Sequence, residues 1–188
     1  MQAGRSRSSN LDATPPDAVR AAFRDLHARR LHGFALLLAL GDRPVAARLA
    51  NDALVAAGEH IGELRHPERA AAWLRARVVR MAGGMGRGAE SPRARADALN
   101  GLGVDPGVFA GLEALTERER AALIATAIER LDRRDAAAIV DSDGQKFDRL
   151  LMRARRRYAA AYGAAAQGAM VDGPLGELVR TIARRAMT

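Results

Sequence analysis

The chain has 188 residues, which is enough for one domain or two small ones. Its hydrophobic fraction of 48% is sufficient for a packed core, whereas an aromatic fraction of only 4% makes an aromatic-lined ligand pocket unexpected. Cysteine is absent, which excludes a disulfide scaffold, thiolate zinc sites and thiol catalysis. The net charge of +8 favours a polyanionic partner, for which nucleic acid is the usual candidate.

No segment of the sequence looks like a membrane span or an export signal. The longest apolar run, from Phe34 to Leu40, is far shorter than the roughly 20 residues that a spanning helix needs. The first ten residues carry charge, but no apolar stretch of the kind found in signal peptides follows them. We therefore expect a cytoplasmic protein without membrane insertion.

Three helices are expected in the first part of the chain, after a polar and disordered tail at 1–13. Apolar residues at helical spacing and helix-start signals define these helices. The first begins at Thr14-Pro15-Pro16-Asp17, the second follows Gly41-Asp42, and the third begins at Pro67. Together they predict a helical domain over residues 14–82.

Glycine and proline are then concentrated in residues 83–107, with room for one short helix at 91–99. Such a composition is typical of a linker, so we interpret this segment as the boundary between two domains. A second helical domain is expected at 108–162. An extension at 163–188 follows it, with an amphipathic helix that begins at Pro174. No segment alternates like a strand, and the predicted fold is all-α.

In the second domain, Thr116 and Glu119 have the spacing of a capping box, and the helix that they open is expected to reach Leu131. Next come a short helix capped by Asp132, a turn at 141–144 and a longer helix at 145–162. This order is typical of a helix–turn–helix, in which the second helix reads the major groove of DNA. The predicted DNA-contacting residues of that helix are Gln145, Lys146, Arg149 and Arg153. An ordinary helical hairpin with a solvated arginine face remains the alternative.

A second basic stripe lies on the third helix, where Arg69, Trp73, Arg77 and Arg80 share one face. A tryptophan between arginines suits single-stranded nucleic acid, because a base can stack on the indole while the guanidinium groups neutralise phosphates. The alternative is a half-buried Trp73 at the edge of the core, with arginines that are merely solvated.

Catalytic and cofactor sites are not indicated. The glycines at 83–88 follow no strand and lack the Gly-Lys-Ser/Thr ending of a phosphate loop. The four histidines lack the spacing and acidic neighbours of a metal site, and no serine lies in a nucleophile elbow. We therefore expect neither an enzyme, a cofactor nor a bound metal.

The order and spacing of these parts resemble bacterial RNA polymerase sigma factors of the extracytoplasmic-function (ECF) group, over residues 17–162. Leu115-Thr-Glu-Arg-Glu-Arg-Ala-Ala-Leu123 is similar to the Leu-Pro-x-x-x-Arg opening of the family's sigma-4 domain. Asp135-Ala-Ala137 stands where the family has Glu-Ile-Ala, and Arg153-Ala-Arg155 matches its Arg-Ala-Arg. In the first half, Gly41-Asp42 and the Ala-Trp-Leu at 72–74 have counterparts in the sigma-2 domain.

The sequence departs from the family where the family contacts its partners. In Ala46-Ala-Arg-Leu-Ala-Asn-Asp52, the helix that should grip the polymerase lacks the usual acidic pair and contains Arg48. The Ile/Val-Ala-Arg-Asn expected after Trp-Leu is replaced by Arg77-Val-Val-Arg80, and a usual Thr-Val-Lys by Lys146-Phe-Asp148.

The resemblance implies a sigma factor that binds core RNA polymerase and directs transcription initiation at promoter DNA. On this reading Leu49, Asn51 and Asp52 face the polymerase, the Trp73 stripe meets the −10 region, and the helix–turn–helix reads a −35 element. An anti-sigma factor is a further partner that the family implies. Two alternatives stay open: a sigma-derived DNA-binding regulator that does not act as a true sigma factor, and an all-α protein-interaction module.

Overall fold

The computed structural model describes residues 16–64, 66–84 and 90–166. Over these ranges the chain forms eight α-helices and one π-helical turn, without a strand, and the all-α prediction is confirmed. The expected tail at 1–13 lies outside the described residues, as does the amphipathic helix that was predicted from Pro174. None of the described helices is long and apolar enough to cross a membrane.

The first three helices, α1 (Pro16–Leu38), α2 (Arg43–Gly58) and α3 (Pro67–Ala82), pack against one another. The turn before α2 depends on glycine, because Gly41 has a φ of +84° and a Cβ there would lie 2.3 Å from the carbonyl oxygen of Arg95. Asp42 caps α2 by accepting a hydrogen bond from the Val45 amide at 3.0 Å.

Part of the predicted linker forms α4 (Pro92–Asn100). The Ser91 side chain caps this helix by accepting a hydrogen bond from the Ala94 amide at 3.2 Å. Leu99 is fully buried, and its side chain lies beside the Gly41 turn. Residues 92–100 therefore pack on the first half of the chain, while the division into two domains stays a prediction.

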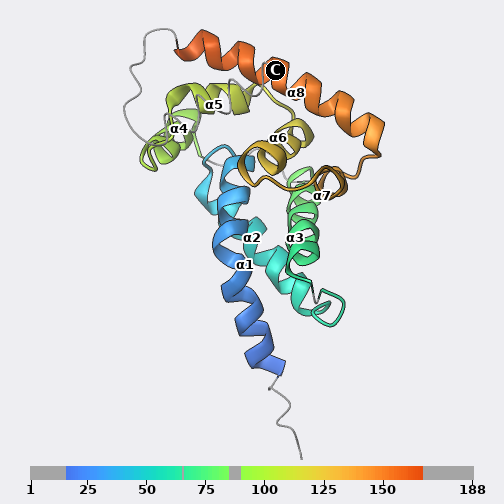
Figure 1. Ribbon diagram of the computed structural model, residues 1–188. Helices are drawn as coiled ribbons and strands as arrows, with labels where there is room; N and C mark the ends of the chain where they lie inside the picture. The colour runs from blue at the N-terminus through green and yellow to red at the C-terminus, as the bar shows by residue number, and fades with distance from the viewer. Residues whose placement is uncertain (1–15, 65, 85–89, 167–188) are drawn as a thin grey trace, which may run out of the picture.

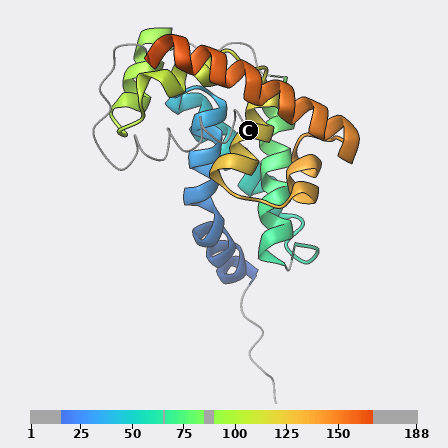
Figure 2. The ribbon, with the colours of Figure 1, turned by 45° about the horizontal axis from the view of Figure 1, so that its top comes forward.

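A second group of helices follows, with the bounds α5 (Pro106–Glu113), α6 (Glu117–Leu123), the π-helical turn η1 (Ile124–Ile128), α7 (Arg133–Ile139) and α8 (Gly144–Ala166). Figures 1 and 2 show the long helix α8 crossing one end of the α1–α3 bundle, with α6 and α7 between them. The α8 helix packs mainly on α5 and α6, and α7 packs on α3.

The η1 turn differs from the prediction of one continuous helix to Leu131. The Thr126 hydroxyl donates to the Ala122 carbonyl at 2.8 Å, which is the acceptor that an α-helix reserves for the Thr126 amide. The backbone widens there, and the Glu129 amide bonds to the Ile124 carbonyl five residues back. This wide turn positions Glu129 for an ion pair with Arg75 of α3.

Two buried arginines join the first half of the chain to the second. Arg75 pairs with Glu129, donates to the Ala71 carbonyl at 2.8 Å and lies over the Phe34 ring at 5.7 Å from its centroid. The Arg120 guanidinium donates to the carbonyls of Leu112 at 2.9 Å, Leu115 at 3.0 Å and Leu38 at the end of α1. The buried apolar residues of both halves also form one continuous cluster.

Candidate nucleic-acid interface

The α7–turn–α8 unit has the form that the sequence predicted. Asp132 caps α7 by accepting a hydrogen bond from the Asp135 amide at 2.8 Å, and Asp143 caps α8 by accepting from the Lys146 amide at 2.9 Å. Between the helices, Asp141 has a φ of +48°. Arg118 of α6 donates to the Asp141 carbonyl at 3.1 Å, so the turn is fixed to the rest of the second half.

The α8 helix has one buried face and one exposed face. Phe147, Ala154 and Tyr158 are buried, at helical spacing, toward the neighbouring helices. On the opposite side lies a set that we call the exposed α8 face: Gln145, Arg149, Met152 and Arg156. Sequence reasoning missed Met152, whose 57% exposure distinguishes it from a core methionine.

Arg153, which the sequence predicted as a DNA contact, forms an ion pair inside the protein. Its guanidinium lies 2.6 Å from the Glu119 carboxylate, and Arg157 lies 2.8 Å from the other oxygen of that carboxylate. The Glu119 side chain is only 1% exposed, whereas the two arginine side chains are about half exposed. The pair thus fixes α8 to α6 and leaves part of each guanidinium in contact with solvent.

Burial of the Glu119 carboxyl raises its pKa, but hydrogen bonds from Arg153 and Thr116 and the charge of Arg157 outweigh that effect. The pKa of Glu119 is therefore below its usual value. Thr116 contributes both its backbone amide and its hydroxyl, at 3.0 Å each, so the predicted capping box is confirmed.

The start of α8 carries two exposed ion pairs. Lys146 lies 2.9 Å from Asp143, and their contact lowers the pKa of Asp143 and raises that of Lys146. Arg133 of α7 donates two hydrogen bonds to Asp148, at 2.9 and 2.6 Å, which lowers the pKa of this carboxyl. The negative charge of Asp148 on α8 is therefore compensated by Arg133 of α7. The spacing of these residues in the sequence did not predict this contact.

The predicted stripe on α3 is a less open surface than that of α8. Arg69 and Arg80 are exposed, whereas Trp73 and Arg77 are partly buried. The Trp73 ring contacts the His60 ring, with centroids 5.6 Å apart and planes tilted by 52°. The indole therefore already has an aromatic neighbour.

The residues expected to face a polymerase lie on different sides of α2. Leu49 is 1% exposed and packs in the core. Asn51 and Asp52 are exposed, and the side-chain amide oxygen of Asn51 accepts a hydrogen bond from Arg24 of α1 at 3.3 Å. Only the two polar members of the set are available to a partner in this conformation.

Within the described ranges, no three acidic or histidine side chains gather as a metal site would require. Comparisons with family models, with curated proteins and with solved structures gave no match for this chain. Among the described residues, the exposed α8 face on the α7–turn–α8 unit is therefore the candidate site for which we propose a function.

Proposed function

We propose that the protein binds duplex DNA with sequence selectivity and places α8 in the major groove. The observation that carries this proposal is the exposed α8 face, which begins in the first turns of the helix. Asp143 caps α8, and a tight turn joins it to α7. Recognition helices meet base edges with their first turns. There Arg149 suits guanine O6 and N7, and Gln145 suits adenine.

The rest of the same face extends the contact along the groove. Met152 supplies an apolar side chain of the kind that packs on a thymine methyl group. Arg156 is exposed one turn further and suits a phosphate, while the solvent-facing parts of Arg153 and Arg157 add positive charge beside it.

In its fuller form, the proposal is that the protein acts as a sigma-type transcription initiation factor of the ECF group. The order of α5 to α8 and the motif residues quoted above support it, and Arg69 and Arg80 would add cations toward the −10 region. Core RNA polymerase would meet α2 at Asn51 and Asp52, and an anti-sigma factor would be a further partner. The burial of Leu49 and the exposure of Arg48 favour a second candidate, a sigma-derived regulator that binds DNA without polymerase.

Two measurements on the full chain test these proposals. Selection from a random duplex pool should enrich one motif, and Arg149→Ala should relax the selection at the base pair that this side chain reads. The matched control is Arg29→Ala, which removes the same charge from an exposed site on α1. A pool that stays random with the unmodified protein overturns both candidates.

The second measurement is a pull-down with purified core RNA polymerase after nuclease treatment. Stoichiometric retention of the polymerase supports the sigma-type proposal, and Asp52→Arg should then weaken it. DNA selectivity without retention supports the regulator instead.

A further inference from the structure

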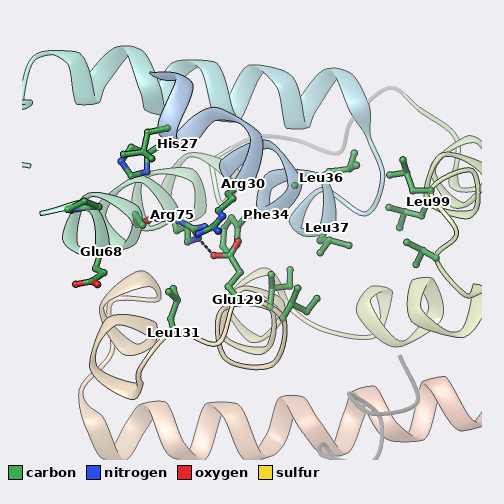
Figure 3. Close-up of a pocket in the computed structure, with 18 residues that line it drawn as sticks. His27, Arg30, Phe34, Leu36, Leu37, Glu68, Arg75, Leu99, Glu129 and Leu131 are labelled. Atoms are coloured by element: carbon green, nitrogen blue, oxygen red, sulfur yellow. Dashed lines mark hydrogen bonds and ion pairs between the residues drawn. The ribbon is translucent and has the colours of Figure 1, made fainter. Parts of the chain in front are cut away.

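A large pocket opens between α1, α3 and the η1 turn, away from the exposed α8 face (Figure 3). Its volume is about 860 Å³. Sites for small organic ligands occupy about 300–1,000 Å³ and are commonly found where two parts of a protein meet. This pocket lies where the first half of the chain packs on the second.

The walls of the pocket are mainly aliphatic. Leu26 and Leu102 border it and remain 61% and 52% exposed, although both are large apolar side chains. Leu37 and Ile128 continue the apolar wall and are partly buried. A flexible aliphatic chain would cover this surface. Phe34 also lines the pocket, but it is only 1% exposed, so a flat aromatic ligand would find little ring surface to stack on.

One part of the pocket carries an excess of positive charge. The buried ion pair of Arg75 and Glu129 lines it, and Arg30 of α1 extends into the same space (Figure 3). Arg75 is paired with this carboxylate, whereas Arg30 is an exposed side chain that contributes a second positive charge. Glu68 also borders the pocket, but it precedes Arg75 by two turns of α3, or about 10 Å along the axis.

The imidazole of His27 also lines the pocket, and its pKa responds to burial and to the same positive charges. Burial lowers its pKa, and the positive charges of Arg75 and Arg30 lower it further. An anion would be stabilised where these cations repel a protonated histidine, and a carboxylate can accept two parallel hydrogen bonds from one guanidinium.

We propose that the pocket binds an aliphatic carboxylate of about eight to ten carbons, with its headgroup on Arg30 and its chain against Leu26, Leu37 and Leu102. This site is separate from the proposed DNA contact, and its test does not use DNA.

The test is isothermal titration calorimetry of the full chain with decanoate, at submicellar concentration and neutral pH. Decan-1-ol and decylammonium have the same chain with a neutral or positive headgroup, so they separate charge recognition from apolar adsorption. Decanoate should bind, and the other two should bind at least about tenfold more weakly. Equal binding of all three, or no binding of decanoate, overturns the proposal.

Two variants locate the site. Arg30→Ala changes an exposed side chain and should weaken decanoate binding about tenfold. Gly33→Leu should abolish it, because Gly33 lines the pocket and a Cβ there meets nothing within 4 Å, so that the new side chain fills the space. The control is Gly163→Leu on α8, where a Cβ also meets nothing. Circular dichroism checks that each variant folds, and unchanged binding in both pocket variants places the ligand elsewhere and contradicts the proposal.

Discussion

At the scale of single residues, the buried Glu119 carboxylate depends on its neighbours to remain charged in the folded protein. A carboxylate that is 1% exposed is stable only if it is paired, and Arg153, Arg157 and Thr116 provide the partners. The same group caps α6 and connects it to α8. Glu119 therefore links helix initiation to the placement of the proposed recognition helix.

Glu119→Gln should lower the free energy of unfolding by about 2 kcal/mol at pH 7, because two charge-assisted hydrogen bonds are lost. The folded-state pKa of Glu119 lies below its usual value of 4.5, so its stabilising contribution is present above that value. It disappears as the pH falls below about 4.5 and passes through the folded-state pKa. Urea unfolding at several pH values checks this, and the difference from the unmodified protein should shrink in acid.

The control for this change is Glu117→Gln, in the same turn but exposed, which should alter stability by no more than about 0.5 kcal/mol. A difference between Glu119→Gln and the unmodified protein that stays constant from pH 7 to pH 3 would contradict the proposed role of the charge.

Arg149 and Arg153 lie one turn apart on α8 and should behave differently. Arg149→Ala should leave stability within about 0.5 kcal/mol but weaken binding to the selected DNA motif by about 1–3 kcal/mol. Arg153→Ala should destabilise the fold by about 1 kcal/mol, a modest value because the arginine is 56% exposed. Thermal unfolding and fluorescence anisotropy on the same preparations separate the two effects. Equal stabilities for the two variants would show that the Glu119 pair does not act as described.

At the scale of elements, α5 and α8 approach closely because α5 contains glycine at the contact. A Cβ on Gly111 would lie 2.5 Å from one ring carbon of Tyr158 and 2.7 Å from another, and that ring is 1% exposed. A Cβ on Gly107 would meet the Tyr162 ring at 2.9 Å. These two tyrosines stack with centroids 5.9 Å apart, so the interface has little room to adjust.

Gly111→Ala should therefore destabilise the protein by about 1–3 kcal/mol through overpacking, although alanine favours a helix over glycine by about 1 kcal/mol. Gly163→Ala on α8 is the matched change in open space, and it should stabilise by up to about 1 kcal/mol. Denaturant midpoints measure both. Stabilisation by Gly111→Ala would mean that α5 and α8 pack less tightly than the structure shows.

The helices were predictable from local signals, since caps and glycine or proline breaks mark their ends in the sequence. Asp42, Thr116 and Asp132 each cap the helix that was expected to begin after them. The η1 turn was not predictable, because Thr126 has the same helical spacing whether its hydroxyl takes the Ala122 carbonyl or points to solvent.

The candidate site was predictable only in part, for a similar reason. The spacing of arginines in the sequence predicts which of them share a face of α8. It does not predict which of them lie close enough to a buried carboxylate to form an ion pair. Glu119 and Arg153 are 34 positions apart, and Arg120 reaches a carbonyl 82 positions away. Such long-range contacts depend on how helices pack, which local periodicity does not determine.

At the scale of the whole molecule, the two halves share one core and the buried pair of Arg75 and Glu129. A sigma-type function would have the halves meet separate promoter elements. If the halves separated for that purpose, α3 would leave α7 and this pair would be exposed to water. The contacts described here thus favour a form in which the two halves move as one body.

Arg75→Ala should destabilise the protein by about 3–5 kcal/mol, because it leaves the Glu129 carboxylate buried and unpaired. The double variant Arg75→Met with Glu129→Leu removes both charges and should recover most of that loss. Equilibrium unfolding of the single and double variants gives the comparison. If the double variant is no more stable than Arg75→Ala, the cost does not come from an unpaired charge.

The contact between Arg120 and the carbonyl of Leu38 also bears on how the chain is synthesised. Leu38 leaves the ribosome long before Arg120 does, and until then the Leu38 carbonyl has water as its partner. Translation proceeds at about 5–20 residues per second, so the wait is several seconds. The α1 helix therefore acquires its final ending only after Arg120 of α6 has been made, so its completion waits for the second half of the chain.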